Sequence, residues 1–378
     1  MTEILAPISI LDYGSTYLRL SIYDKKLLSK NLFFEEKLNF TREKNIKEDQ
    51  KISNIIIKAE KELGNHLNEV YLMIDSPSIY SLDISIKKNY DKKIISNKNI
   101  NYLINECENE VKINNKEKDI LHIEIFKIFL DDSEIKNLKN ISQEATKINI
   151  ELKFILINSS VCDELKKIFL KKHISFKNIF CTSYIKSKGL IKNLDISGYN
   201  AFIDIGLKKS SLTIFEDNKL IYINNTHIGG DHITRDISKI LNIDYRTAES
   251  KKLKFYKKKS FENILNENEL LKKIINSRLE EIVEILFLNC PFIKERNINS
   301  SLNLFFVGNG SKVLNENLLS FGPEFNFIKE MSIIEEKNYD CCNTAAEFSL
   351  NDQKIQPQKP LLNVENVGFF EKLFNYFK

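Results

Sequence analysis

Glycine is scarce in this chain of 378 residues, which holds only 11 glycines and no tryptophan. Globular proteins usually carry about 7% glycine, so each glycine kept here is informative. Glycine is required where the backbone takes a positive φ or approaches a ligand closely. Six glycines fall in three places: after two acidic strand ends, before a helix, and in a late turn. They are Gly14 and Gly206, Gly229 and Gly230, and Gly308 and Gly310.

Other absences exclude whole classes of protein. The chain has no apolar run near the ~18 residues of a spanning helix, and its start lacks the layout of a signal peptide. We therefore expect a cytosolic protein. The six cysteines form no CxxC motif, so no zinc or thioredoxin-type site is indicated. Lys+Arg (56) and Asp+Glu (52) nearly balance, which disfavours a nucleic-acid partner. Hydrophobic residues make up 42%, enough for a sizeable core.

The order of apolar segments indicates an internal duplication. Residues 7–13 read as a buried strand containing Asp12, followed by a turn at Gly14 and a returning strand. Residues 200–206 repeat this pattern with Asp204 and Gly206, and two more alternating strands follow. The sequence thus predicts two related α/β halves.

Periodicity predicts the remaining elements. The expected strands are 17–23, 27–34, 70–74 (which runs into Asp75), 79–86, 121–130, 148–157, 211–215, 220–226 and 302–307. The expected helices are 46–63, 100–111, 160–171, 233–241, 245–255, 269–288 and 344–350, with a further helix starting after residue 311.

Two acidic strand ends that face each other can hold a triphosphate between two domains. The turn amides would bind phosphate oxygens, and Asp12 and Asp204 would hold Mg²⁺, usually through water. One Asp-x-Gly-x-Thr string is weak evidence because it occurs by chance. Two at repeated positions, together with Gly-Gly-Asp at 229–231 and Gly-x-Gly-Ser at 308–311, are far stronger.

These motifs resemble the actin-like ATPase superfamily and, within it, the bacterial cell-division protein FtsA. Residues 10–16 (ILDYGST) and 202–206 (FIDIG) resemble the two phosphate motifs, and 305–311 (FFVGNGS) resembles the adenosine motif. The most specific match is 227–237 (HIGGDHITRDI), followed by 248–252 (AESKK). The resemblance implies an α/β fold of duplicated ribonuclease-H-type domains around a nucleotide cleft.

The resemblance also implies roles for single residues, with ATP and Mg²⁺ as cofactors. The implied phosphate and Mg²⁺ contacts are Asp12, Gly14, Ser15, Thr16, Asp204 and Gly206. The residues implied beside the ribose and phosphates are Gly229, Gly230 and Asp231. The residues implied at the adenosine are Glu249, Lys252, Gly308, Gly310 and Ser311. No residue is assigned as a catalytic base.

The implied domain division follows the same family. A first actin-like domain would comprise 1–75, completed by 158–199 and 334–350. Residues 76–157 would form the FtsA-type inserted subdomain, which meets the next subunit of a filament. The second domain would span 200–333, with a helical part, 241–299, that docks the C-terminal tail of FtsZ. A linker, 351–365, and a membrane-targeting helix, 366–378, would follow.

The second phosphate loop departs from the family pattern, Asp-x-Gly-Gly-Gly-Thr-x-Asp. Two of its glycines are Leu207 and Lys208 here, and its closing aspartate is Ser211. These side chains could block backbone approach to the γ-phosphate, or Lys208 or Lys209 could donate charge to it. We therefore expect nucleotide binding and leave ATP hydrolysis open.

The last residues predict an amphipathic helix. Val367, Phe370, Leu373, Phe374 and Phe377 recur at three- and four-residue steps. Twelve residues make a helix of about 18 Å, too short to span a bilayer but suited to the membrane interface. Phe369, Lys372 and Lys378 complete the expected membrane contacts. A helix docked on the protein core is the alternative.

The leading hypothesis is an FtsA-like scaffold that binds ATP, polymerises, and tethers FtsZ filaments to the cytoplasmic face of the inner membrane at the division site. Later divisome proteins would be further partners. One alternative is a phosphotransferase of the same superfold, of the sugar kinase or exopolyphosphatase type. A pilus-assembly relative of FtsA is a closer alternative, since it shares the fold but typically lacks the terminal helix.

Overall fold

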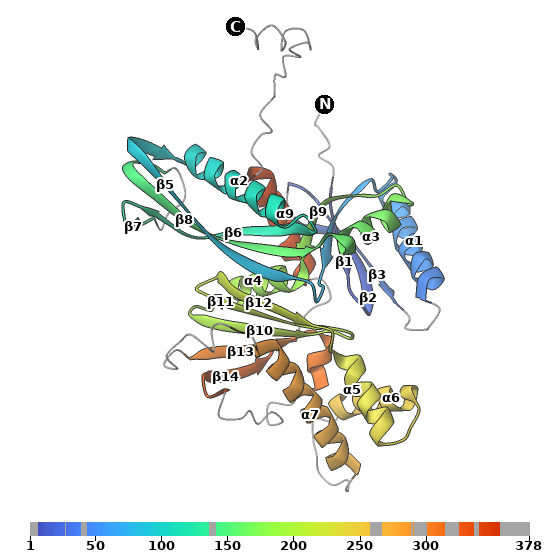
Figure 1. Cartoon of the computed structure of the whole chain (residues 1–378). Coiled ribbons are helices and arrows are strands. Elements are labelled where there is room, and N and C mark those ends of the chain that lie inside the picture. Colours follow the sequence, from blue (N-terminus) through green and yellow to red (C-terminus); the bar gives the residue numbers. More distant parts are fainter. Residues whose placement is uncertain are drawn as a thin grey trace.

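Two five-stranded sheets and one four-stranded sheet, with their helices, make up the part of the protein that the structure describes (Figure 1). The computed structural model describes residues 7–26, 28–38, 44–135, 141–257, 267–288, 290, 301–313, 325–335 and 340–355. The two five-stranded sheets lie one above the other in Figure 1, and the four-stranded sheet lies beside the first.

The first sheet has the strand order β3-β2-β1-β4-β9. Its strands are β3 (Lys30–Lys37), β2 (Tyr17–Tyr23), β1 (Ile8–Tyr13), β4 (Glu69–Ile74) and β9 (Ser175–Cys181). The central strands β1 and β4 are near-continuous apolar runs that are almost wholly buried, as expected for strands covered on both faces.

The second sheet repeats this order as β12-β11-β10-β13-β14. Its strands are β12 (Lys219–Thr226), β11 (Ser210–Glu216), β10 (Tyr199–Ile205), β13 (Leu302–Val307) and β14 (Ile328–Ile333). In each sheet the first three strands in sequence are antiparallel and the next two join in parallel. The predicted duplication is therefore present in the fold.

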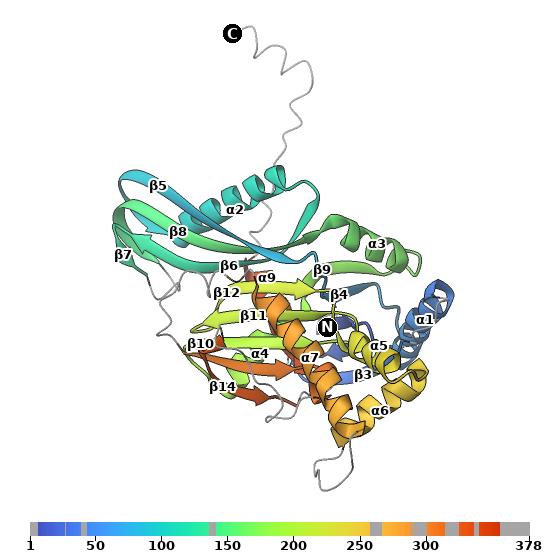
Figure 2. The same cartoon turned by 60° about the horizontal axis from the view of Figure 1, so that its bottom comes forward.

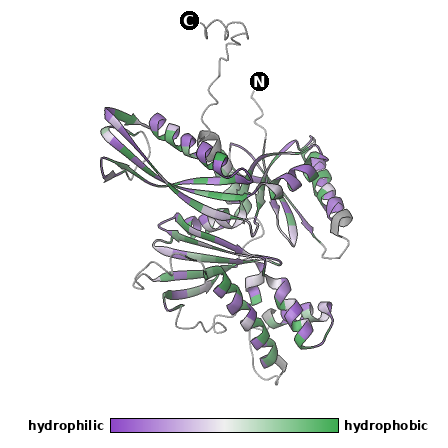
Figure 3. Cartoon of the chain, in the orientation of Figure 1, coloured by the Kyte–Doolittle hydropathy of each residue, from purple (hydrophilic) through white to green (hydrophobic). Residues whose placement is uncertain are grey.

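The third sheet has the order β5-β8-β6-β7, and all of its described pairings are antiparallel. Its strands are β5 (Tyr80–Ser96), β8 (Ser142–Asn158), β6 (Lys118–Leu130) and β7 (Ser133–Glu134). Hydrophobic and hydrophilic residues interleave along its long strands (Figure 3), because one face packs against α2 (Asn97–Asn114). Near β12 its residues also bond the second sheet, where Lys153 donates to the carbonyl oxygen of Ile221 at 2.7 Å.

The remaining helices of the described residues pack on the two five-stranded sheets or, as α6 does, on a neighbouring helix (Figure 2). They are α1 (Lys44–Leu63), α3 (Ser159–Leu170), α4 (Thr182–Leu194), α5 (Gly230–Ile240), α6 (Tyr245–Lys257), α7 (Glu267–Phe287), the 3₁₀ helix η1 (Asn309–Val313) and α9 (Asp340–Ile355). Helix α4 links the two sheets, and its apolar side chains share one core with residues of both, such as Leu20 of the first sheet and Phe215 of the second. This places α4 at the junction of the two halves.

Several elements differ from those expected. Four elements were not expected from the sequence, because they are short or amphipathic segments without a clear apolar period: β7, β9, α4 and β14. The turn at 308–311 leads into a 3₁₀ helix, and β5 is twice the expected length. Helix α9 continues to Ile355, so residues 351–355 of the expected linker are helical; the first proline comes only at Pro357.

Candidate functional site

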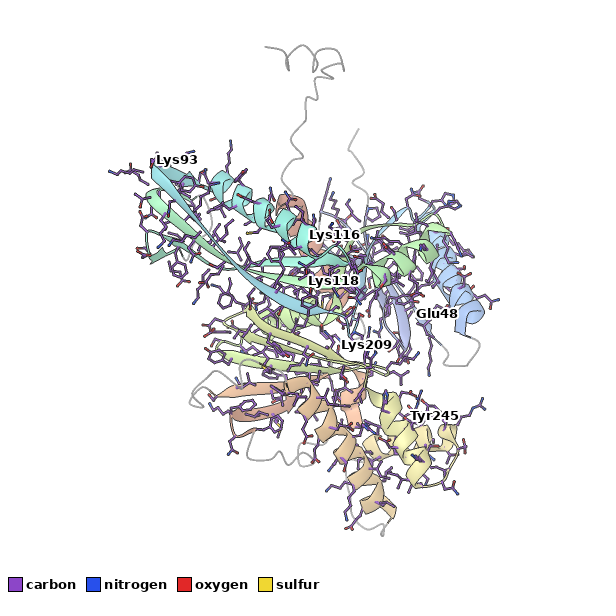
Figure 4. The ribbon with its side chains drawn as sticks, viewed as in Figure 1. Glu48, Lys93, Lys116, Lys118, Lys209 and Tyr245 are labelled. Atoms are coloured by element: carbon purple, nitrogen blue, oxygen red, sulfur yellow. The ribbon has the colours of Figure 1, made fainter. Side chains whose placement is uncertain are left out.

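A cavity of about 130 Å³ lies between the two five-stranded sheets, where β1 and β10 end. Figure 4 marks its position by the label of Lys209. Its walls include both acidic strand ends and both turns. Its polar and charged lining includes Asp12, Ser15, Thr16, Arg19, Asp75, Thr182, Lys186, Asp204, Lys209, Ser210, Ser211, Asn225 and Lys312.

The two turns have the same backbone geometry despite different sequences. The Gly14 amide donates to the carbonyl oxygen of Tyr17 at 3.1 Å, and the Gly206 amide donates to that of Lys209 at 3.0 Å. A Cβ at Gly14 would lie 2.9 Å from the Tyr17 carbonyl oxygen, and a Cβ at Gly206 would lie 2.9 Å from the Lys209 carbonyl oxygen. Each turn therefore needs glycine at its first position, as the sequence indicated.

Asp12 is held by an arginine of its own hairpin. It is only 5% exposed, and Arg19 lies directly opposite it in the β1–β2 register. The Arg19 Nη1 lies 3.2 Å from Asp12 Oδ2, and its Nε donates to Glu35 Oε2 at 2.8 Å. Burial would lower the pKa of Arg19, but Asp12 and Glu35 raise it above its ordinary value, so the guanidinium stays charged.

Asp204 is held by a lysine from the linking helix. Lys186 on α4 donates to Asp204 Oδ2 at 2.6 Å, and both side chains are largely buried. On the other side Asp204 lies against Gly308, where a Cβ would come 2.1 Å from Asp204 Oδ1. Gly308 also has a φ of +84°. Glycine at this position gives the carboxylate its space.

Lys209 crosses from the second turn to the first sheet. Its Nζ donates to the backbone carbonyl of Asp75, the residue after β4. The Asp75 carboxylate accepts hydrogen bonds from the Ser183 amide at 3.1 Å and hydroxyl at 2.9 Å. Burial raises the pKa of Asp75 and lowers the pKa of Lys209. Both groups are thus deep inside the cleft.

The cavity gathers half of the predicted nucleotide contacts. Those that line it are Asp12, Gly14, Ser15, Thr16, Asp204, Gly206 and Gly308. Those that lie outside its lining are Gly229, Gly230, Asp231, Glu249, Lys252, Gly310 and Ser311. The second group stays a prediction as an adenosine and ribose site.

The N-terminus of α5 packs on the second turn. The Gly230 amide donates to the Gly206 carbonyl oxygen at 2.9 Å, and the Asp231 amide donates to that of Leu207 at 2.7 Å. A Cβ at Gly229 would come within 2.8 Å of three backbone atoms of the turn. The glycine pair therefore allows helix and turn to touch, and the turn carbonyls cap two α5 amides that could otherwise face an anion.

Lys252 is committed to the protein interior. It is 5% exposed, and its Nζ donates to the Gly230 carbonyl oxygen at 2.9 Å and to Thr234 Oγ1 at 2.7 Å. It also pairs with Glu249 at 2.7 Å. Together these contacts tie α6 to the start of α5, which supports a structural role for Lys252 and Glu249.

The sequence analysis gave no site role to Arg19, Asp75, Thr182, Lys186 or Lys312, all of which line the cavity. Asp75 had a signal, since it follows a buried strand just as Asp12 and Asp204 end theirs. Arg19 could have been inferred from the hairpin register. Lys186 had none, because α4 itself was not predicted.

The residues at the two aspartates do not fit a Mg²⁺ ion. Magnesium prefers several oxygen ligands in an octahedron, whereas Arg19 and Lys186 each take an oxygen of the carboxylate assigned to the metal. The second oxygen of Asp204 lies against Gly308. No group of three or more metal-ligating side chains occurs within the described ranges.

A larger cavity of about 680 Å³ adjoins the first turn between α1 and α3. Both cavities share Tyr13, Gly14, Ser15, Asp75 and Lys209 in their walls. Tyr13 donates to Glu48 of α1, labelled in Figure 4, and burial raises its pKa. The two cavities therefore share part of their walls at the first turn.

Sequence comparisons show similarity to cell division protein FtsA over part of the chain. The family model of cell division protein FtsA matches residues 201–285. Two FtsA proteins, from two strains of Helicobacter pylori, are each 27% identical to this chain over 156 residues, or 41% of the chain. The matched segment spans 31% of the length of each relative.

The fold is shared over nearly the whole chain with a solved structure of the PilM-PilN type IV pilus biogenesis complex. The TM-score is 0.59 at 13% identity, and the alignment covers 89% of this chain and 90% of that one. The predicted fold of duplicated actin-like domains is confirmed by this likeness and by the repeated sheet order. The chain thus has an actin-like fold and is similar to FtsA over residues 201–285.

Proposed function

We propose that this protein is a cell-division scaffold of the FtsA type, which assembles with itself and links FtsZ filaments to the membrane surface. The observation that carries the proposal is the FtsA family match at 201–285 on an actin-like body. That segment holds the second turn, α5, α6 and most of α7, so it joins the cleft to the helical unit beside it. The proposal includes ATP binding in the cleft and assigns no residue to ATP hydrolysis.

The domain division predicted from the sequence is part of the proposal. The third sheet with α2 would be the inserted subdomain that meets the next subunit. The unit of α5, α6 and α7 would dock the C-terminal tail of FtsZ. It supports this role by exposing large apolar side chains, among them Ile240 (55% exposed) and Leu253 (49% exposed).

Binding of the FtsZ tail tests the docking surface. Leu253→Asp on α6 places a charge where an apolar contact is expected, and we expect its affinity to fall at least about ten-fold. Fluorescence anisotropy with a labelled FtsZ C-terminal peptide measures it. Ile113→Asp on α2, 60% exposed, is the matched control and should bind as wild type does. Equal affinity of the two variants would contradict the proposed surface.

Membrane attachment is assigned to residues 366–378, which lie outside the described residues. No helix in the described ranges is long and apolar enough to cross a membrane. A short amphipathic anchor binds weakly by itself, and a filament multiplies such anchors through effective concentration. We expect polymer-dependent pelleting with anionic liposomes that is lost when 366–378 is deleted. Unchanged pelleting of the truncated protein would refute the anchor.

The likeness to a chain of the PilM-PilN complex favours a second candidate, a pilus-assembly protein. The two functions differ in partner. A pilus-assembly protein would bind a PilN peptide, since PilN is named in that complex, and would ignore the FtsZ peptide. Anisotropy with both peptides on the same full-length protein separates the candidates, and preference for the pilus peptide would replace the first proposal.

A further inference from the structure

Each acidic strand end in the cleft is already met by a protein cation. Asp12 pairs with Arg19 at 3.2 Å and Asp204 pairs with Lys186 at 2.6 Å. The third strand end, Asp75, has its backbone carbonyl bonded by Lys209. The cations thus lie where a divalent ion would be drawn.

These ion pairs are costly to open. The four paired side chains of Asp12, Arg19, Asp204 and Lys186 are between 7% and 15% exposed. A metal that took both carboxylates would break both of these buried ion pairs, which is unfavourable. Arg19 would keep its pair with Glu35. Arginine in particular cannot respond by losing its proton. The cleft therefore favours its own cations over a metal.

The same cations leave the cavity suited to an anion. Among the described residues that line it, four side chains are cationic and three are acidic. The fourth cation is Lys312 of η1. Hydroxyl groups of Thr182 and Ser211 add donors to the wall. Charge-assisted hydrogen bonds of this kind are the strong contacts of phosphate groups.

The cations also come from different parts of the chain. Arg19 lies on β2 of the first sheet, Lys186 on the linking helix, and Lys209 in the turn of the second sheet. A phosphate chain between the sheets would contact all three parts at once. In this arrangement the two lysines and the arginine supply the positive charge that a divalent ion supplies in metal-dependent phosphate sites.

We propose that the cleft binds a polyphosphate anion without a divalent metal, with Arg19, Lys186 and Lys209 in the place of Mg²⁺. The proposal rests on the phosphate-binding cleft of the proposed function and changes its cofactor. The anion is the phosphate chain of a nucleotide or an inorganic polyphosphate, since both present the same oxygens.

Isothermal titration of the full-length protein tests this. ATP and inorganic tripolyphosphate are titrated separately, in MgCl₂ and in EDTA. We expect each affinity in EDTA to stay within about two-fold of that in Mg²⁺, because the protein supplies the neutralising charge. Equal binding of both probes would identify the phosphate chain as the ligand, and tighter ATP binding would identify a nucleotide. An affinity at least about ten-fold weaker in EDTA, or no binding in either buffer, overturns the proposal.

Lys186→Met removes one cation and keeps most of the side-chain volume. We expect tripolyphosphate binding in EDTA to be at least about ten-fold weaker, because one charge-assisted hydrogen bond to the anion is lost. We also expect MgCl₂ to restore part of it, because Asp204 becomes available. Lys186→Arg retains the charge and should bind in EDTA as wild type does, which separates charge loss from misfolding.

Lys192→Met on the same helix is the matched control, since Lys192 is 64% exposed and pairs with Glu347 at the surface. It should leave binding unchanged. Wild-type-like binding by Lys186→Met in EDTA would overturn the assignment of Lys186. FtsZ-peptide binding is measured on the same samples, so a failure of the metal-free cleft is distinguished from a failure of the scaffold function.

Discussion

The two acidic turns of the cleft share one backbone and differ in how their aspartate is neutralised. In the first, the residue opposite Asp12 in the hairpin is Arg19, so the cation is local. In the second, the residue opposite Asp204 is Ser211, and the cation is Lys186 from the linking helix. The two turns have the same backbone geometry, whereas the cation that pairs with the aspartate comes from the same hairpin in one half and from α4 in the other.

This difference shows that a turn and its chemistry can diverge separately. The backbone bond from Gly14 to Tyr17 and its counterpart from Gly206 to Lys209 depend only on a glycine at the first position. The identity of the facing cation depends on which side chain the surrounding fold brings near. The second half has therefore become dependent on α4, whereas the first is complete within one hairpin.

The largest effect is expected where Asp204 lies against Gly308. Gly308→Ala adds a Cβ 2.1 Å from Asp204 Oδ1 and 2.9 Å from the Ile205 carbonyl oxygen, at a φ of +84°. We expect a loss of about 4 kcal/mol in unfolding free energy, from backbone strain of about 1–2 kcal/mol and overpacking of about 1–3 kcal/mol. Urea unfolding measures it.

Gly198→Ala is the matched control for that substitution. Gly198 also has a positive φ, +73°, but a Cβ there meets nothing within 4 Å. It should cost only the strain, about 1–2 kcal/mol. Equal losses for the two variants would show that the contact between Gly308 and Asp204 adds nothing.

A second prediction concerns the pH dependence of the unfolding free energy, which we expect to arise from His122 of β6. Its Nε2 accepts from the Cys181 amide at the end of β9 at 2.9 Å, and its ring stacks on Phe180. Burial, and then the charge of Lys188, lower the pKa of His122 to about 3. The unfolded state therefore binds a proton first as pH falls below about 6.5.

The sign follows from linkage: stability is complete above pH 6.5 and is lost as pH falls from there toward 3. At pH 5 the loss is about 2 kcal/mol, from about 1.4 kcal/mol per pH unit. We expect His122→Gln to remove this loss in urea unfolding at pH 7.5 and 5. His66→Gln, at a side chain that is 88% exposed, should retain it. An unchanged pH slope in His122→Gln would contradict the assignment.

The smallest expected difference is the sharpest test of the shared turn geometry. In Gly14→Ala and in Gly206→Ala, the new Cβ lies 2.9 Å from a carbonyl oxygen three residues on. Each should lose about 1–3 kcal/mol, and the two losses should agree within about 0.5 kcal/mol. If urea unfolding gave clearly different losses of unfolding free energy, the two turns would not have the same tolerance for a Cβ.

Much of the fold could be predicted from the sequence, because its signals are local. The strands at 7–13 and 200–206 are continuous apolar runs that end in an acidic residue and a glycine, and both form as expected. Segments such as α4 and β9 were missed because their apolar residues follow no simple period. The expected linker, 351–365, overlaps α9 at residues 351–355, because these mostly polar residues are compatible with helix.

The candidate site was predictable only in part. Half of the expected contacts line the cavity, and these belong to the acidic strand ends, the two turns and Gly308. Gly229 and Gly230 lie against the backbone of the second turn and outside the cavity lining, and their ligand role stays a prediction. A glycine kept for close approach does not reveal what approaches it.

By itself, the sequence determined the duplication, the two acidic strand ends and the glycine of each turn, because these follow from short-range patterns of polarity and backbone freedom. Only the tertiary structure decided which cation faces which carboxylate. Lys186 and Asp204 lie on different elements, and packing of α4 between the two sheets brings their side chains to 2.6 Å. The charge balance of the cleft, and with it the choice between a metal and an anion, is therefore a property of the assembled fold.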